Sequence, residues 1–172
     1  MISFTGGTRA GLEIVRKAGL KKIGMELGSN SPVIVMDDCD LEKAVECSVS
    51  GAFWAVGQNC IGVQRIYVQE KVYDEFEARF VAGTRRLKVG RQLEETTDMG
   101  PMITEEEARR VEDWVKEAVG LGARLLTGGR RRGTLFEPTV FADMPAAAWL
   151  DHEEVFGPVV NLYKVASLDE AI

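Results

Sequence analysis

The segment Gly57-Gln58-Asn59-Cys60 places a thiol directly after a polar pair, at the end of an apolar, helix-like stretch. A cysteine thiolate is a strong nucleophile and can attack an electrophilic carbon such as that of a carbonyl group. A lone cysteine is more often a small apolar residue that fills space in a protein interior. The residue type alone therefore leaves both roles open for Cys60.

A carboxylate, Glu26, lies near the end of the short apolar stretch "KKIGMEL", which Gly28 breaks. A carboxylate in this position is either a surface charge or a group held for acid–base chemistry with a raised pKa. Both readings of Glu26 stay open at this point.

The stretch "FTGGTRAGLEIV" combines a strand, a glycine turn and a helix start. Glycines let the backbone approach a phosphate closely, and a helix N-terminus offers unpaired N–H groups to an anion. This pattern indicates a possible pyrophosphate site at Gly6, Gly7, Thr8 and Gly11. Gly-Gly turns before helices are also common in purely structural settings, and G-G-T-R-A-G departs from the usual G-x-G-x-x-G fingerprint.

The other cysteines and the single histidine argue against two kinds of site. The chain has three cysteines, an odd number, no C-x-x-C pair and one histidine. Neither a disulfide framework nor a zinc site is therefore expected. We predict that Cys47 lies in the core, on the apolar face of a helix, and that Cys39 lies in an acidic loop. A reducing cytoplasm is the expected location, and no metal is expected.

Composition limits the class of molecule. The chain has 172 residues, of which 45% are hydrophobic and 28% charged, which suits one domain or slightly more with a real core. Its apolar runs are too short to cross a bilayer, and its start lacks a signal-peptide pattern. A formal charge of −6 disfavours nucleic-acid binding, and we predict that the basic cluster at 130–132 is a solvated loop.

Alternating strand and helix patterns predict a three-layer α/β fold with a largely parallel sheet flanked by helices. Thr104, followed by Glu107, has the pattern of a capping box and predicts a helix start. A helix starting near Asp40 is predicted to continue to about Gly57. The predicted strands are "ISFTG", "KKIGMEL", "PVIVM", "RIYVQ", "ARLLTGG", "LFEPTVF" and "VVNLYKVA", and both ends of the chain are expected to be cut.

Five stretches together resemble the aldehyde dehydrogenase superfamily, in the family's order and through nearly the whole chain. The family shows F-T-G-S-T-x-x-G, E-L-G-G-x-x-P, G-Q-x-C with an arginine five residues on, G-x-x-x-x-P-T-V and E-E-[IV]-F-G-P. Here they read "FTGGTRAG", "ELGSNSP", "GQNCIGVQR", "GTLFEPTVF" and "EEVFGPV". Departures are Gly7 in place of serine, Ser29 in place of the second glycine of E-L-G-G, and Ala55 in place of a frequent asparagine.

The resemblance implies a catalytic role for two residues. Cys60 would attack the aldehyde carbon to form a thiohemiacetal, which loses a hydride to the nicotinamide and becomes a thioester. Glu26 would then activate the water that releases the carboxylic acid. The resemblance thus implies oxidation of a small aldehyde.

The resemblance also implies a cofactor, NAD or NADP, and residues that hold it. Glu154 would accept hydrogen bonds from the nicotinamide ribose, and Phe156 would pack near the nicotinamide ring. The alternatives without a role in cofactor binding are a surface carboxylate for Glu154 and core packing for Phe156. The implied cofactor-binding residues are Gly6, Gly7, Thr8, Gly11, Leu27, Glu154 and Phe156.

The resemblance implies that residues 1–31 are the C-terminal part of a dinucleotide-binding domain and residues 32–172 an incomplete catalytic domain. Family members are longer and supply a ribose-binding lysine and an oxyanion-binding asparagine that this chain lacks. We therefore expect these 172 residues alone to turn over aldehyde poorly or not at all. The alternative is a non-catalytic remnant with a structural or association role. A homo-oligomer is expected, without nucleic acid or membrane partners.

Overall fold

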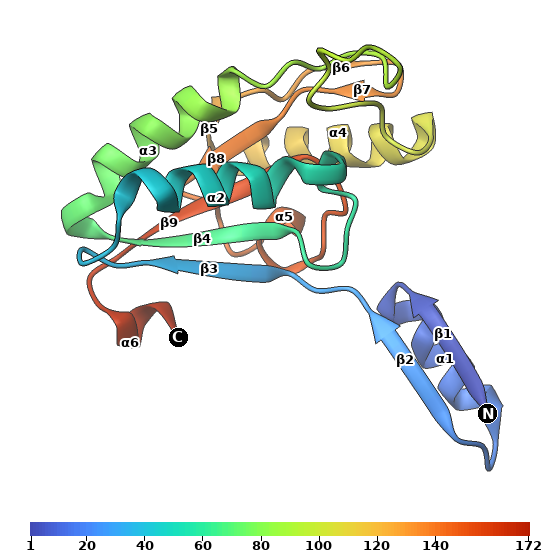
Figure 1. Cartoon of the computed structure of the whole chain (residues 1–172). Helices are drawn as coiled ribbons and strands as arrows, with labels where there is room; N and C mark the ends of the chain where they lie inside the picture. Colours follow the sequence, from blue (N-terminus) through green and yellow to red (C-terminus); the bar gives the residue numbers. More distant parts are fainter.

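The computed structural model describes residues 1–172, and its first part is a small βαβ unit. Strand β1 (Ile2–Gly6) leads into helix α1 (Thr8–Ala18), and strand β2 (Ile23–Leu27) pairs with β1 in parallel. This unit forms its own two-stranded sheet and projects from the rest of the chain (Figure 1). It is joined to the body by residues 28–30.

The body is built on a five-stranded sheet in the order β3-β4-β9-β8-β5. Strands β3, β4, β9 and β8 are parallel neighbours, and only the edge strand β5 pairs antiparallel. The strands are β3 (Ser31–Val35), β4 (Val63–Gln69), β5 (Arg124–Thr127), β8 (Thr139–Ala142) and β9 (Val159–Val165), with a separate hairpin of β6 (Arg131–Arg132) and β7 (Leu135–Phe136).

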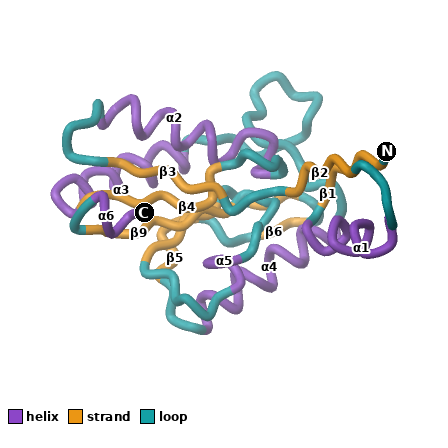
Figure 2. Tube along the Cα trace, turned by 90° about the horizontal axis from the view of Figure 1, so that it is seen from below, coloured by secondary structure: helices purple, strands orange, loops and turns teal.

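Helices cover both faces of this sheet, so the body has three layers (Figures 1 and 2). Helices α2 and α3 lie on one face, and α4 and α5 lie on the other. The helices are α2 (Leu41–Phe53), α3 (Glu70–Arg85), α4 (Glu105–Gly120), α5 (Trp149–His152) and α6 (Leu168–Ala171), with the 3-10 turn η1 (Trp54–Gly57) after α2. The predicted α/β class with a largely parallel sheet is confirmed.

Side-chain caps fix where the helices begin. The hydroxyl of Thr104 accepts a hydrogen bond from the Glu107 N–H at 3.2 Å, as the capping-box pattern predicts. The carboxylate of Asp40 accepts one from the Lys43 N–H at 3.1 Å and starts α2. Helix α2 runs from this cap to Phe53, and the chain then turns into the Cys60 segment.

Two predicted elements differ from the structure. The stretch "LFEPTVF" is not one strand but two, β7 and β8, separated at Glu137-Pro138. Proline has no N–H to donate to a ladder, so the pairing stops there. Helix α2 ends at Phe53 rather than near Gly57, because the backbone of the following residues is left-handed.

The predicted environment is wrong for Cys47 and wrong in part for the basic cluster. Cys47 is exposed, because the buried face of α2 runs through Val45, Ser48 and Ala52 and residue 47 lies outside that stripe. In the basic cluster Arg130 and Arg132 are exposed, as predicted, but Arg131 begins β6 and pairs with Glu112 on α4 at 3.2 Å, with only 17% of its side chain exposed.

Candidate active site

The turn before Cys60 has an unusual backbone. Ala55, Val56 and Gly57 have φ angles of 52°, 62° and 67°, so three consecutive residues are left-handed. This conformation is costly for Ala and Val and is kept only where the surroundings enforce it. A Cβ at Gly57 would overlap the Gly157 carbonyl, so glycine is required. The chain thus turns sharply out of α2 and presents Cys60 on a loop.

The loop is held by hydrogen bonds, and the thiol at its tip is exposed. The Gln58 side-chain oxygen accepts from the Ile103 N–H at 2.8 Å, and the Asn59 amide donates to the Trp54 carbonyl at 3.3 Å. The backbone N–H of Cys60 donates no hydrogen bond within the chain. An N–H in this position is available to an oxygen that develops negative charge beside the thiol.

The linker between the two sheets lies against this loop. The Ser29 hydroxyl donates to the carbonyl oxygen of Cys60 at 2.7 Å, and the Ser29 N–H donates to Oε1 of Glu154 at 3.1 Å. The buried amide of Gln64 donates to the Ser29 carbonyl at 2.7 Å and accepts from the Val155 N–H at 2.8 Å. Segments far apart in the sequence, around residues 29, 60 and 154, therefore meet.

A second set of bonds fixes the linker from the other side. The Arg65 guanidinium donates twice to the Asn30 carbonyl, at 3.1 and 2.9 Å. The Asn30 amide donates to the Asp151 carbonyl at 2.9 Å. The arginine five residues after Cys60 thus orders the linker rather than the thiol itself.

Glu154 lies in a partly buried position at this junction. Burial raises the pKa of Glu154 above its usual value, although the Ser29 N–H and the positive charge of Arg110 act in the opposite direction. A Cβ at Gly28 would overlap the Glu154 carboxylate, so the linker backbone passes directly over it. Oε1 is occupied by the Ser29 N–H, while Oε2 has no partner and can accept a hydrogen bond from a ligand.

The remaining predicted residues lie on the βαβ unit and near the junction. Gly6 and Gly7 form the turn into α1, with Thr8 as the first helical residue. Gly11 is buried, and a Cβ there would collide with Leu27, so this glycine also has a packing role. Phe156 is 39% exposed with a φ of 43°. Glu26 is exposed at the end of β2, with no hydrogen bond to Cys60.

A sequence model of the aldehyde dehydrogenase family matches residues 1–172, the whole chain. The chain belongs to the aldehyde dehydrogenase family. It is 56% identical over 172 residues to an aldehyde-dehydrogenase-like protein of Sinorhizobium fredii, covering 100% of this chain and 34% of that protein. The sequence resemblance drawn from five motifs is confirmed.

Solved structures of the family have the same fold. Aldehyde dehydrogenase 21 from Physcomitrella patens, in complex with the reaction product succinate, matches with a TM-score of 0.95 at 48% identity, over 98% of this chain and 35% of that one. The glyceraldehyde-3-phosphate dehydrogenase GapN from Methanocaldococcus jannaschii, complexed with NADP, matches with a TM-score of 0.95 at 42% identity, over 99% and 37%. The chain spans about a third of the length of the relatives it matches.

Two residues of the junction were not expected to contribute to it. Gln64 falls on the apolar side of the alternating strand "VQRIYVQ", where Ile66 and Val68 are also buried. A polar side chain on a buried strand face needs hydrogen-bond partners. The polar residue in this apolar pattern is the one sequence signal that could have indicated the role of Gln64. Ser29 stood out only as a departure from the aldehyde dehydrogenase motif, and its hydroxyl partner on the loop of Cys60 is visible only in three dimensions.

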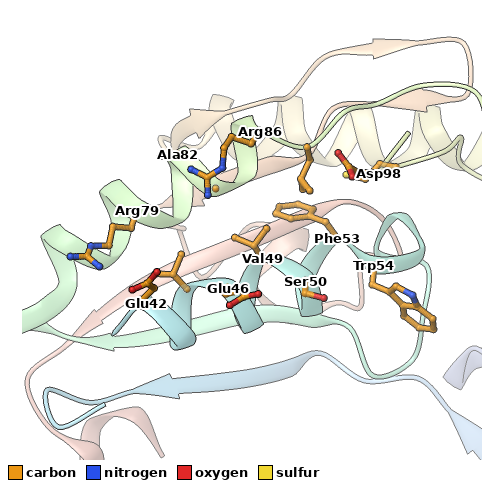
Figure 3. Close-up of a pocket in the computed structure, with 14 residues that line it drawn as sticks. Glu42, Glu46, Val49, Ser50, Phe53, Trp54, Arg79, Ala82, Arg86 and Asp98 are labelled. Carbon is orange, nitrogen blue, oxygen red and sulfur yellow. The ribbon is translucent and has the colours of Figure 1, made fainter. Parts of the chain in front are cut away.

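A surface pocket lies away from this junction. It has a volume of about 870 Å³ and lies between α2 and α3, with Phe53 and Val49 at its floor and Glu42 and Arg79 on opposite rims (Figure 3). None of the predicted site residues lines it. The chain contains no group of three or more metal-ligating side chains and no helix with the length and apolar character needed to cross a bilayer.

Proposed function

We propose that this chain carries the thiol and the carboxylates of an NAD- or NADP-dependent oxidation of a small aldehyde to a carboxylic acid. The observation that carries the proposal is the junction of Ser29, Cys60 and Glu154. Ser29 hydrogen-bonds both to the backbone carbonyl of Cys60, whose thiol is exposed, and to Glu154, a partly buried carboxylate with a free oxygen. Membership of the aldehyde dehydrogenase family supports this chemistry.

Cys60 is the proposed nucleophile. Its thiolate adds to the aldehyde carbon, and the oxygen that becomes negatively charged can accept a hydrogen bond from the free N–H of Cys60. Loss of hydride from the resulting carbon leaves an acyl group on the sulfur as a thioester. Glu26 is the proposed base that takes a proton from water, so that the water attacks the thioester and regenerates the thiol. Its exposure on β2 leaves it accessible to water.

Residues of this chain fit a nicotinamide cofactor, which when bound supplies the hydride acceptor. Oε2 of Glu154 is free to accept a hydrogen bond from a ribose hydroxyl, and exposed Phe156 offers an apolar ring surface. Gly6, Gly7, Thr8 and Gly11 are proposed to lie along the dinucleotide, where the first N–H groups of α1 have no intrahelical acceptor. Leu27 is proposed to line the same region.

The domain division and the assembly are part of the same proposal. Residues 1–31 would belong to a dinucleotide-binding domain and residues 32–172 to the catalytic domain. The separate two-stranded sheet of β1 and β2, followed by the five-stranded sheet from Ser31, supports this division. A homo-oligomer in a reducing cytoplasm is proposed with it.

Separate replacement of Cys60 and of Cys47 tests the proposed function. In the protein that contains residues 1–172, Cys60→Ser should reduce aldehyde-dependent NAD(P)H formation by about 10³-fold or more, since a serine hydroxyl is hardly ionised at neutral pH. Exposed Cys47→Ser is the matched control and should retain activity. Substantial turnover by Cys60→Ser would reject the proposal.

A further inference from the structure

The hydroxyl of Ser29 connects the linker between the two sheets to the loop of Cys60, and the proposed reaction requires a fixed arrangement of these two segments. It lies 2.7 Å from the carbonyl oxygen of Cys60 and 2.5 Å from the hydroxyl oxygen of Ser31. The N–H of the same residue lies 3.1 Å from Oε1 of Glu154. One residue thus touches both the peptide of the nucleophile and the proposed cofactor-binding carboxylate.

The direction of these hydrogen bonds follows from proton counting. A carbonyl oxygen can only accept, so the single hydroxyl proton of Ser29 must be donated to Cys60. The proton between the two hydroxyls is then that of Ser31, which donates to Ser29. A donor that itself accepts a hydrogen bond is a better donor, so Ser31 strengthens the bond from Ser29 to Cys60.

The loop of Cys60 needs such a bond because packing does little to hold it. Cys60 and Ile61 are both exposed, and Ile61 has 77% of its surface accessible. The carbonyl that Ser29 holds belongs to Cys60 itself, so its orientation helps set the direction in which the Cα–Cβ bond and the thiol point. Glycine or alanine at position 29 would keep the N–H bond to Glu154 but lose the bond to Cys60.

We propose that Ser29 is a positioning residue whose hydroxyl holds the Cys60 peptide and whose N–H holds Glu154, so that nucleophile and cofactor carboxylate share one support. This inference rests on the proposed function. It assigns no proton transfer to Ser29, because the hydroxyl acts through the backbone of Cys60. A misplaced thiol lowers the rate of attack and leaves cofactor affinity nearly unchanged, since the Glu154 contact is made by the backbone.

The test compares Ser29→Ala, Ser29→Thr and the control Ser50→Ala, an exposed serine of α2, in the protein that contains residues 1–172. Loss of one hydrogen bond should lower kcat for aldehyde oxidation about three- to tenfold in Ser29→Ala, with the KM for NAD(P) changed less than about twofold. Ser29→Thr keeps the hydroxyl and should restore most of kcat. Amide hydrogen exchange should accelerate in Ser29→Ala only, at Gly62, the amide of this loop that donates to a carbonyl, that of Asn59 at 3.3 Å.

Wild-type kcat in Ser29→Ala, or unchanged exchange at Gly62 in that variant, would overturn the inference. A general loss of stability would instead accelerate exchange across the sheet strands and would equally count against a local positioning role. Failure of the proposed function is a separate result, because it is seen as retained turnover in Cys60→Ser whatever the Ser29 variants do.

Discussion

Gly28 has no side chain, and this leaves the space that the Glu154 carboxylate occupies. Its Cα passes so close to the Glu154 carboxylate that any Cβ would displace it. The displaced atoms belong to the end of a flexible side chain, so the fold can adjust while Glu154 loses its position. A substitution at Gly28 can therefore impair ligand binding by Glu154 without a large loss of folding stability.

We expect Gly28→Ala to lower affinity for NAD(P) by about tenfold or more, because a hydrogen bond to a charged group contributes about 1.5–3 kcal/mol. The free energy of unfolding should change by less than about 1 kcal/mol. Cofactor titration followed by fluorescence, with urea unfolding alongside, measures both. Gly24→Ala on β2 is the control, since its Cβ would meet only a distant methyl of Met1. Unchanged affinity in Gly28→Ala would argue against Glu154 as a ribose ligand.

The raised pKa of Glu154 predicts a pH dependence of folding stability. Burial disfavours the charged carboxylate, so the folded pKa exceeds the unfolded one. The contribution of Glu154 is then fully present below the unfolded pKa and is lost as pH rises through the folded pKa. Glu154→Gln removes this loss, so the variant should gain stability relative to wild type as pH rises above the unfolded pKa of about 4.3.

Urea unfolding at several pH values measures this difference. Glu153→Gln, an exposed neighbour, is the control and should show no such gain. A Glu154→Gln curve parallel to that of the wild type over the whole range would mean that burial does not raise this pKa.

At the residue scale the sequence indicates candidate chemical roles but not the contacts between the residues. The motif around Cys60 indicated a nucleophile, and E-E-V-F-G-P indicated the carboxylate of Glu154. Nothing in the spacing indicated that Ser29 would join them, because the bond spans 31 positions to Cys60 and 125 to Glu154. Such contacts depend on tertiary arrangement, which periodicity does not encode.

At the scale of elements, the turn after α2 is the part most sensitive to change. We expect Gly57→Ala to destabilise the fold by about 2–4 kcal/mol, since it adds left-handed strain and a clash with the backbone of Gly157. Thermal unfolding measures the effect. Gly120→Ala near the end of α4 meets no atom within 4 Å and should be neutral or slightly stabilising. Equal stability of Gly57→Ala and wild type would contradict the tight turn.

Elements with strong local signals were predicted well, and those set by packing were not. Helix α1 begins directly after the glycine turn, as predicted, and α4 begins at its predicted cap. The short helix α5 has no hydrophobic periodicity of its own and depends on packing against α4, where Trp114 and Trp149 stack at 6.0 Å. The end of α2 was misplaced because apolar residues continue through a turn that tertiary contacts impose.

At the scale of the molecule, the βαβ unit leaves an apolar helix face uncovered. Leu12 and Val15, three positions apart on α1, are 49% and 48% exposed. We expect the 172-residue chain to self-associate through this face, because exposed apolar surface favours association. Light scattering coupled to gel filtration should show oligomers, and Leu12→Gln with Val15→Gln should shift them toward monomer. A wild-type chain that stays monomeric at high concentration would contradict this expectation.

A search for an acyl group on Cys60 is the most direct test of the proposed reaction. The protein that contains residues 1–172 is prepared with Glu26→Gln, which removes the proposed base and nearly conserves volume, then mixed with NAD(P) and aldehyde, quenched in acid and mapped by peptide mass. The account predicts a burst of about one NAD(P)H per site and a Cys60 peptide heavier by the aldehyde less two hydrogens. Turnover with an unmodified Cys60 peptide, or with the acyl group on Cys39 or Cys47, would contradict it.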